Sequence, residues 1–334
     1  MISKDRILEI SSKLKEIKAV VYGDVMLDTY IYGDIGPQNP EKKAVPIIIP
    51  QRIEYMLGGA ANTANNLSHL GAEVFLYGLT GSETSASRLR RLCKKNHIKG
   101  ELISIADRKT TRKIRHIVDG HYALRTDIEL CKELDEKQTD GVIFQMRLES
   151  INLDVLIVSD YAKGATNERM TRYLLKIARE KGAYFIAQPK PSTFRFYEGA
   201  DLIMLNLKES EEIVRGKLNS RENDPIEDSY RRTLGNLLLE SVNHNSSIVI
   251  TYGKHGMSFY GRDNVYEHVP TKPLNVEDGT YQGAGDTALA AYALSYIATR
   301  DVAESLRMAN HAASVAIRMP GTSAPTIEDL VENL

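Results

Sequence analysis

The chain has 334 residues, 42% of them hydrophobic, and 43 basic against 44 acidic side chains leave a formal net charge of -1 at pH 7. A chain of this size can bury a large core and suits one domain with an attached subdomain. With so small a net charge, no bulk field draws it to nucleic acid or to an anionic membrane. Cys93 and Cys131 are too few for a disulfide framework or a thiolate metal site, which favours the cytoplasm.

The first 17 residues are expected to form an amphipathic helix. Ile7, Leu8, Leu14 and Ile17 recur among lysines and glutamates, and no uninterrupted apolar core marks the segment as a signal peptide. No later stretch is long enough to span a bilayer. We therefore expect no membrane partner.

Short β-rich runs then alternate with segments of helical length. The expected strands are residues 19–22, 74–77, 155–158, 184–187, 202–205 and 248–251. Helices such as residues 166–181 and 230–243 separate them. Apolar strands without strict alternation predict a mostly parallel sheet covered on both faces, which is a doubly wound α/β core of three layers.

Two segments break this alternation. Residues 29–56 carry further β-rich runs, and residues 111–127 contain two runs on either side of Asp119-Gly120, a strong hairpin signal. Together they predict a small antiparallel sheet that closes over a ligand as a lid or pairs with a second copy. A hairpin without function is the alternative. We see no repeat or linker, so residues 1–334 are expected to form a single domain with this lid as a subdomain.

Near the carboxyl end, a glycine-rich segment joins a carboxylate to a helix start. Gly283, Ala284 and Gly285 precede Asp286, and residues 288–297 have the length and alanine content of a helix. The amides of the loop would lie at the positive end of that helix, where a polyphosphate binds, while Asp286 could take a proton from an alcohol. Phosphoryl transfer to a sugar hydroxyl requires this pairing. The alternative is a plain glycine-rich turn.

Polar residues and glycines follow the first strand. Asp24 and Asp28 lie at the carboxyl edge of the predicted sheet, where doubly wound folds bind ligands, and could accept hydrogen bonds from vicinal hydroxyls. A helix or turn cap is the alternative. Gly58 and Gly59 allow close approach to a ligand, and Asn62 offers donors and an acceptor at what reads as a helix start.

Two later segments also lie at this edge. Asn206 and Glu209 follow the strand at 202–205 and could hold water around a magnesium ion, or form a helix cap. Thr251, Gly253 and Gly256 belong to a strand-to-turn segment whose glycines could let an adenine or ribose lie on the backbone, unless it is only a hairpin turn.

These motifs, in this order and over essentially the whole chain, resemble the ribokinase-type (PfkB) sugar kinases. More narrowly, residues 21–28, 58–62, 159–164 and 256–258 are similar to the D-glycero-β-D-manno-heptose-7-phosphate kinases of bacterial lipopolysaccharide biosynthesis. Many members of that group are fused to a nucleotidyltransferase, and this chain is expected to be a stand-alone version.

The resemblance implies ATP-dependent, magnesium-dependent phosphorylation of the anomeric hydroxyl of D-glycero-D-manno-heptose 7-phosphate to the 1,7-bisphosphate. It makes Asp286 the base and the amides of Ala284, Gly285 and Asp286 the anion hole. Asn206 and Glu209 would serve the phosphates and, through water, the magnesium. The turn carrying Thr251, Gly253 and Gly256 would serve the nucleotide.

The resemblance also implies contacts for the sugar. Asp24 and Asn62 would bind its hydroxyls, and Asp28 could contribute. Because the substrate already carries a phosphate, the pocket should contain cations as well. The candidates are two lysines near the strand ends and two arginines of the lid: Lys163, Lys190, Arg112 and Arg125. Each of them could instead be a solvated surface charge.

The chain departs from the pattern of the heptose kinases at two places. They usually carry Asp-x-Thr before the glycine loop, where this chain has Thr280, Tyr281 and Gln282. Asp278 is two places too early to replace the aspartate, so activation by a monovalent cation such as potassium is not expected. They also carry Asp-Pro-Lys where this chain begins with Gln188, which holds magnesium-bound water less strongly.

Three functions follow from these observations. The first is the heptose-phosphate kinase, and the second is a related kinase for another free or phosphorylated sugar. The third is a sugar-phosphate or nucleotide sensor that has lost turnover, which Gln188, Thr280 and Gln282 suggest and the retention of Asp286 argues against. The partners expected are ATP, a sugar phosphate and, through the lid, a second copy of the chain.

Overall fold

The computed structural model describes residues 2–218, 227–262, 265–271, 282–322 and 324–334. Its main sheet has nine strands in the order β13-β12-β11-β10-β9-β8-β1-β4-β5. The strands are β1 (Lys18–Gly23), β4 (Glu73–Thr80), β5 (Lys99–Ser104), β8 (Val155–Ser159), β9 (Tyr184–Gln188), β10 (Leu202–Asn206), β11 (Ser247–Thr251), β12 (Met257–Tyr260) and β13 (Tyr266–Val269). All six predicted strands are present.

The sheet is parallel except at one edge, where β12 and β13 are antiparallel. From β1 the chain first adds β4 and β5 on one side and later β8 to β11 on the other. The strand order therefore reverses beside β1, and ligands bind at the carboxyl ends of the strands near such a point.

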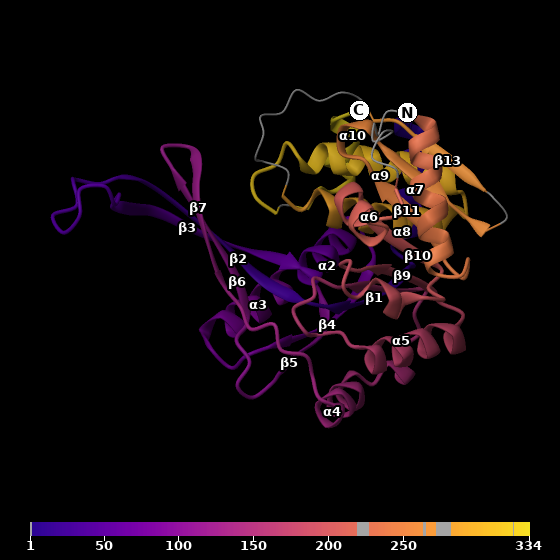
Figure 1. Ribbon diagram of the computed structural model, residues 1–334, viewed down its shortest axis with the longest axis horizontal. Coiled ribbons are helices and arrows are strands. Elements are labelled where there is room, and N and C mark those ends of the chain that lie inside the picture. Colours follow the sequence, from indigo (N-terminus) through magenta and orange to yellow (C-terminus); the bar gives the residue numbers. More distant parts are fainter. Residues whose placement is uncertain (1, 219–226, 263–264, 272–281, 323) are drawn as a thin grey trace.

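Helices cover both faces of the main sheet (Figure 1). Alternate residues of β1 enter separate cores, with Val21 on one side and Val20 on the other. The first core packs against α1 (Lys4–Leu14), α2 (Ala60–His69), α3 (Thr84–Lys95), α8 (Ala284–Thr299), α9 (Val302–Ala316) and α10 (Ile327–Glu332). The second packs against α4 (Glu136–Met146), α5 (Glu168–Lys181), α6 (Leu207–Ile213) and α7 (Asp228–Ser241). The predicted doubly wound, three-layer core is confirmed.

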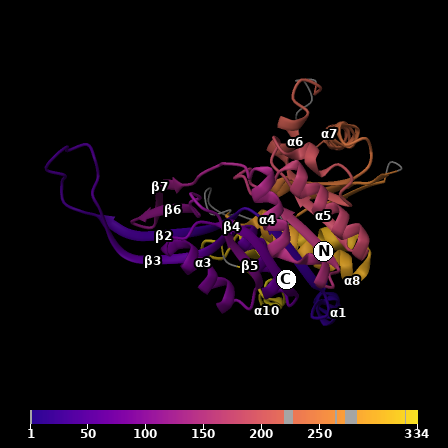
Figure 2. The same ribbon diagram turned by 90° about the horizontal axis from the view of Figure 1, so that it is seen from below.

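A second sheet projects from the core as the lid (Figures 1 and 2). Its four strands lie in the order β3-β2-β6-β7 and are β2 (Val25–Ile35), β3 (Ile48–Gly59), β6 (Thr111–Val118) and β7 (His121–Ile128). Asp119 and Gly120 form the predicted turn between β6 and β7.

The pairing in the lid is antiparallel within its two hairpins and parallel between β2 and β6. These two strands run the same way because each follows a parallel strand of the main sheet and leaves from its carboxyl edge. The lid also begins earlier than predicted, at Val25, so Asp28 belongs to a lid strand and not to a loop after β1.

Helix α1 is shorter than the predicted segment and is capped by Ser3, whose hydroxyl accepts a hydrogen bond from the Arg6 amide. Within the described ranges, no helix combines the length and apolar character needed to cross a membrane.

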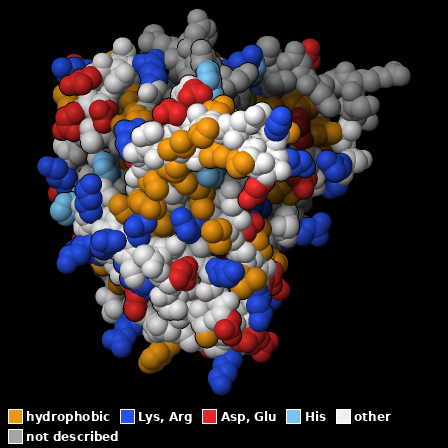
Figure 3. Space-filling model, turned by 90° about the vertical axis from the view of Figure 1, so that its left-hand side faces the viewer, with side chains coloured by type: hydrophobic (Ala, Val, Ile, Leu, Met, Phe, Trp, Pro, Cys, Tyr) orange, Lys and Arg blue, Asp and Glu red, His pale blue; other side chains and the backbone are white. Residues whose placement is uncertain are grey.

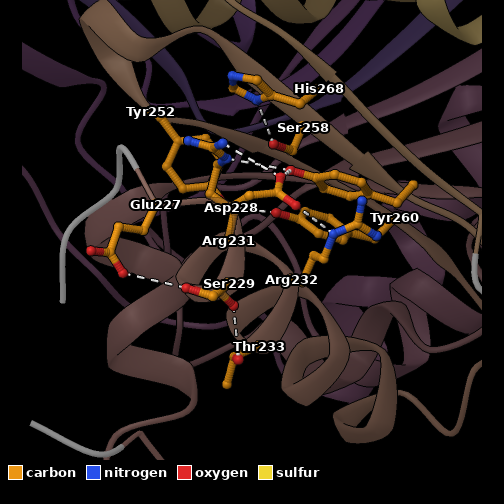
Figure 4. Close-up of polar contacts among 11 residues, drawn as sticks. Glu227, Asp228, Ser229, Arg231, Arg232, Thr233, Tyr252, Ser258, Tyr260 and His268 are labelled. Atoms are coloured by element: carbon orange, nitrogen blue, oxygen red, sulfur yellow. Dashed lines mark hydrogen bonds and ion pairs between the residues drawn. The ribbon is translucent and has the colours of Figure 1, made fainter. Parts of the chain in front are cut away.

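A polar cluster joins α7 to the antiparallel edge of the main sheet (Figure 4). The Asp228 carboxylate accepts hydrogen bonds from Tyr266 on β13 and from Arg232 one turn along α7, both at 2.6 Å. The hydroxyls of Tyr252 and Tyr260 lie 2.8 Å apart. Since Tyr252 directly precedes Gly253, this cluster fixes one end of the predicted nucleotide turn.

Candidate active site

A cavity of about 140 Å³ lies at the carboxyl ends of β8 to β11, and we call it the base cavity. Segments that are far apart in the sequence meet there. Its lining residues are Asp160, Tyr161, Gln188, Lys190, Met204, Leu205, Asn206, Glu209, Thr251, Gly283, Gly285 and Asp286. Seven of the predicted site residues and Gln188 thus share one cavity.

The glycine loop leads directly into α8, as predicted. Gly283 is the residue before the helix and has a φ of 80°, a left-handed conformation that favours glycine. A Cβ at this position would lie 2.9 Å from the Asn62 amide nitrogen. The next amides, of Ala284, Gly285 and Asp286, belong to the first turn of the helix and have no partner within it. Free amides at a helix start can bind an anion, and this role stays a prediction here.

Asp286 lies in this first turn and is only 6% exposed. Its Oδ1 accepts a hydrogen bond from the Tyr161 hydroxyl at 2.6 Å, and its Oδ2 accepts one from the Asn62 side-chain amide at 2.8 Å. Burial raises the pKa of Asp286, whereas these two hydrogen bonds act to lower it. A buried carboxylate held from both sides has the geometry of a general base.

Asn62 belongs to a polar network between α2 and α8. Its side-chain oxygen accepts a hydrogen bond from the Asn66 amide at 3.3 Å, and the Thr287 hydroxyl donates to Asn66 at 2.7 Å. All three side chains are buried. Asn62 directs its amide at the base, because α2 packs directly against α8. Its predicted contact with sugar hydroxyls stays a prediction.

Asp24 was also predicted to bind sugar hydroxyls, and that role stays a prediction. Its carboxylate is 3% exposed and accepts three backbone hydrogen bonds, from the amides of Tyr161, Lys163 and Ala165. Burial raises the pKa of Asp24, and these three amides act to lower it. In this structure Asp24 therefore orders the segment after β8 that carries Tyr161, and it does not line the base cavity.

Asp28 faces the core from the lid strand β2. It forms a buried ion pair with Arg115 of β6, with 3.0 Å between Oδ1 and the guanidinium nitrogen. A Cβ at Gly58, on the neighbouring strand β3, would lie 2.8 Å from the Asp28 carboxyl carbon, so glycine permits this close packing. Gly59 follows at the junction with α2. Sequence reasoning missed Arg115, although alternation along β6 places it on the same face as Lys113.

Asn206 and Glu209 form a capping box at the start of α6. The side chain of each accepts a hydrogen bond from the backbone amide of the other, at 2.9 and 3.0 Å, and Glu209 also pairs with Lys190. The oxygen of the Gln188 side chain is buried nearby without a hydrogen-bond partner among the described residues. These side-chain oxygens, of Glu209, Asn206 and Gln188, suit a hydrated magnesium ion, because magnesium contacts protein through few oxygens.

The predicted nucleotide turn follows β11. Thr251 ends that strand and lines the base cavity, and Gly253 begins a single 3-10 turn that ends before Gly256. The Tyr252 amide donates to the Gly256 carbonyl at 2.8 Å, which closes the turn. The strand-to-turn prediction is confirmed, whereas the contact with a nucleotide stays a prediction.

Three of the four predicted cations do not line the base cavity. Lys163 pairs with Glu129 at 2.7 Å and the exposed Arg125 with Asp127 at 2.8 Å. Arg112 alternates with Lys113 along β6 and so lies on the other face of the lid sheet. Only Lys190 lines the base cavity. Charge alone could not show these directions, because each depends on a partner or a register set by the fold.

Tyr161 is the main site residue that sequence reasoning missed. It stands in the segment 159–164 directly after β8, so the rule that selected Asn206 after β10 also applies to it. Asp278, Thr280 and Tyr281, where the chain departs from the heptose kinases, lie outside the described residues. Gln282 accepts a hydrogen bond from the Tyr30 hydroxyl of the lid at 2.6 Å.

The protein has the features of a ribokinase-like sugar kinase. These are a doubly wound sheet, a carboxylate beside the free amides at the start of a helix, and a lid next to that carboxylate. Residues 16–329 match the family model described as pfkB family carbohydrate kinase. The bifunctional protein HldE of Bradyrhizobium diazoefficiens is 34% identical over 314 residues, which cover 92% of this chain and 61% of that protein. HldE of a Shewanella species is 34% identical over 320 residues, 96% of this chain and 64% of its own length.

Solved structures show the same fold. Phosphofructokinase-2 from Escherichia coli, in complex with potassium, has a TM-score of 0.75 at 18% identity and covers 95% of this chain and 97% of its own. A ribokinase from Cryptococcus neoformans, in complex with ADP, has a TM-score of 0.68 at 17% identity and covers 95% and 99%. The chain belongs to the pfkB family of carbohydrate kinases and is an ATP-dependent sugar kinase. It spans somewhat less than two thirds of the length of the HldE proteins that it matches.

Proposed function

We propose that this kinase transfers the γ-phosphoryl group of ATP to the anomeric hydroxyl of D-glycero-D-manno-heptose 7-phosphate and forms the 1,7-bisphosphate. The observation that carries the proposal is the buried Asp286 carboxylate beside the free amides of α8. The choice of sugar rests on the resemblance of residues 21–28 and 159–164 to heptose kinases and on the similarity to HldE. The reaction would take place in the cytoplasm and serve lipopolysaccharide synthesis.

Asp286 accepts the proton of the sugar hydroxyl as the hydroxyl oxygen attacks the γ-phosphorus, and ADP leaves as the bond between that phosphorus and the β–γ bridging oxygen breaks. The contact from the Tyr161 hydroxyl to Oδ1 shows that this carboxylate oxygen can receive a hydroxyl donor. Asn62 holds the other oxygen and so fixes the direction of the carboxylate. The amides of Ala284 and Gly285 stabilise the charge that develops on the transferred group.

Magnesium bound with the nucleotide would neutralise phosphate charge. Glu209, Asn206 and Gln188 would hold it through water, since their oxygens lie around the same cavity as Asp286. Lys190 would contact the phosphates from the same wall, where it already faces Glu209. Gln188 supplies a neutral oxygen where the heptose kinases carry a carboxylate, so we expect weaker binding of magnesium-bound water at this position.

The sugar would be held between the base and the lid. Asp28 lies at the root of β2, close enough to Asp286 to raise its pKa, and so faces the acceptor side. Its carboxylate can accept hydrogen bonds from sugar hydroxyls while Arg115 balances its charge. Asp24 contributes indirectly by ordering the segment that carries Tyr161.

The test is magnesium-dependent release of ADP with ATP and heptose 7-phosphate, compared with glucose 6-phosphate, fructose 6-phosphate, ribose 5-phosphate and ribose. Asp286→Asn should lower kcat by about two to four orders of magnitude and leave ATP affinity nearly unchanged. Asp140→Asn, a surface change of the same type, is the control. Unchanged turnover in Asp286→Asn would refute the assignment of the base.

The same panel separates two other functions. Release of ADP with a different sugar would make the chain a related kinase with another substrate. Binding of a sugar phosphate or nucleotide without release of ADP would make it a sensor, for which Gln188 and Gln282 are the motivating residues. Gln282 contacts the lid through Tyr30, so a lid whose position depends on a bound ligand is compatible with either function.

We also propose a homodimer through the outer face of the lid. Hydrophobic side chains gather on the side of the molecule from which the lid projects (Figure 3). The strand register places Ile53, Ile31, His116 and Leu124 in one row across the four strands, and Ile53 and Leu124 are 46% and 54% exposed. A second copy of the same row would cover them, because an apolar row across a sheet is complementary to itself about a two-fold axis.

Light scattering during size-exclusion chromatography tests the dimer. The unchanged chain should elute with twice the mass of one chain, and Leu124→Glu should elute as a monomer. Phe144→Glu, which replaces an exposed apolar residue on α4 away from the lid, should remain a dimer. A monomeric mass for the unchanged chain at micromolar concentration would refute the proposal.

A further inference from the structure

The inner face of the lid sheet, the face that carries Asp28, holds a lysine between two carboxylates that each pair with an arginine. Lys113 of β6 lies between Asp28 on β2 and Asp127 on β7 in the strand register. Each of these carboxylates is paired with an arginine, Asp28 with Arg115 and Asp127 with Arg125. The lysine between them is therefore left without either carboxylate as an ion-pair partner.

Lys113 has no carboxylate within ion-pair distance among the described residues. Its side chain is partly buried, and burial lowers the pKa of Lys113 while Asp28 and Asp127 act to raise it. The ammonium nitrogen lies 5.6 Å from the centre of the Tyr161 ring, and the hydroxyl of that ring contacts Asp286. A poorly solvated cation without a counter-ion thus lies close to the base.

The other lysines near the site are already neutralised. Lys190 pairs with Glu209 in the wall where the ATP phosphates are proposed to bind, and Lys163 pairs with Glu129. A phosphate carried by the sugar lies at the other end of the molecule from its reacting hydroxyl. When that hydroxyl is at Asp286, this second phosphate must lie away from the ATP phosphates, and the lid is on that side.

We propose that Lys113 binds the phosphate group that the acceptor sugar already carries and thereby selects phosphorylated sugars. This inference rests on the proposed function, in which the acceptor is a sugar phosphate. Binding of a dianion next to Lys113 supplies the counter-charge that this lysine lacks. It would also draw β6 towards Tyr161, because the ammonium group belongs to the lid and the base belongs to the core.

The test compares Lys113→Met with the unchanged enzyme in steady-state kinetics. Removing one charge-assisted contact should raise KM for heptose 7-phosphate about 10- to 100-fold and leave KM for ATP within about twofold. Inorganic phosphate, used as a competitive inhibitor against the sugar, should lose potency by a similar factor. Lys113→Arg should recover part of the affinity, and Lys176→Met, at an exposed lysine on α5, is the matched control.

The outcomes separate this inference from the proposed function. Equal KM values for heptose 7-phosphate in Lys113→Met and the unchanged enzyme would overturn the role of Lys113 and leave the kinase assignment intact. Turnover only with a different phosphorylated sugar would refute the heptose assignment, and a KM for that sugar that rises in Lys113→Met would support Lys113. Turnover only with an unphosphorylated sugar, at unchanged KM in the variant, would refute both.

Discussion

Tyr161→Phe removes one hydrogen bond to the base and little else. The variant keeps the ring that lies 5.6 Å from Lys113 and 5.0 Å from Lys190, but it loses the hydroxyl that donates to Asp286 Oδ1 at 2.6 Å. A hydrogen bond to a charged group contributes about 1.5 to 3 kcal/mol, and about 1.4 kcal/mol corresponds to one pKa unit. Loss of this donor should therefore move the pKa of Asp286 by about one to two units.

The sign of the change follows from the state that Tyr161 favours. Its hydroxyl donates to the ionised carboxylate and acts to lower the pKa of Asp286, against the effects of burial and of Asp28, both of which raise it. Without the hydroxyl the pKa rises. Because the base must be ionised to accept a proton, activity at low pH is lost first, and activity well above the new pKa should be largely retained.

The assay is kcat/KM for the sugar from about pH 5 to 9.5 in both enzymes, with ATP saturating. The acid limb of the profile should move about one to two pH units upward in Tyr161→Phe. Tyr173→Phe, which removes a tyrosine contact to Glu149 on the surface, is the control and should leave the limb unchanged. A uniform loss of activity with the limb in place would refute the reasoning, because it would mean that Tyr161 does not act on the pKa of the base.

Three further predictions concern stability and the lid. Arg115→Met leaves the buried Asp28 carboxylate unpaired and should lower the free energy of unfolding by about 3 to 5 kcal/mol in urea titrations, much of which Asp28→Asn should restore. Gly58→Ala forces a Cβ within 2.8 Å of the Asp28 carboxyl carbon and should cost about 1 to 3 kcal/mol, with a raised KM for the sugar; an unchanged KM would show that Asp28 does not serve the acceptor. Asp228→Asn should cost under about 1 kcal/mol at pH 7, since Asp228 is largely exposed. Contacts with Tyr266 and Arg232 lower the pKa of Asp228 to about 2, so this contribution is present above the ordinary pKa of an aspartate and should disappear as pH falls towards 2.

The main sheet was predictable because its strands are buried on both faces. Residues 155–158 have no polar side chain, and the structure extends that strand by one residue, to Ser159. The hairpin of the lid was predictable from Asp119-Gly120, since these residues accept the backbone conformation of a tight turn. The parallel pairing of β2 with β6 was not, because the two strands are far apart in the sequence and their pairing depends on where both leave the main sheet.

The composition of the site was easier to predict than the directions of its side chains. Asn62 and Asp286 were both selected, but their contact joins residues 224 positions apart, and nothing local to either residue indicates it. Lys163 was selected for its charge, whereas its direction depends on Glu129. Tyr161 was missed because an aromatic residue directly after a strand is usually assigned to the hydrophobic core. Only the structure shows that its hydroxyl contacts Asp286.

Asp286 and the charges proposed to select the sugar, those of Lys113 and Asp28, come from different parts of the fold. Their effects on kinetics should therefore be separable. Asp286 is fixed by α2, by α8 and by the segment after β8, all of which pack in the core. Lys113 and Asp28 lie on the lid strands β6 and β2, and Tyr30 of the lid contacts Gln282 beside the glycine loop. Changes in the core contacts should therefore move the pH profile, whereas changes on the inner face of the lid should move KM for the sugar. A lid variant that shifted the acid limb would show that the two parts are coupled, and Asp28 is the residue through which that coupling would pass, because its charge acts on the pKa of Asp286.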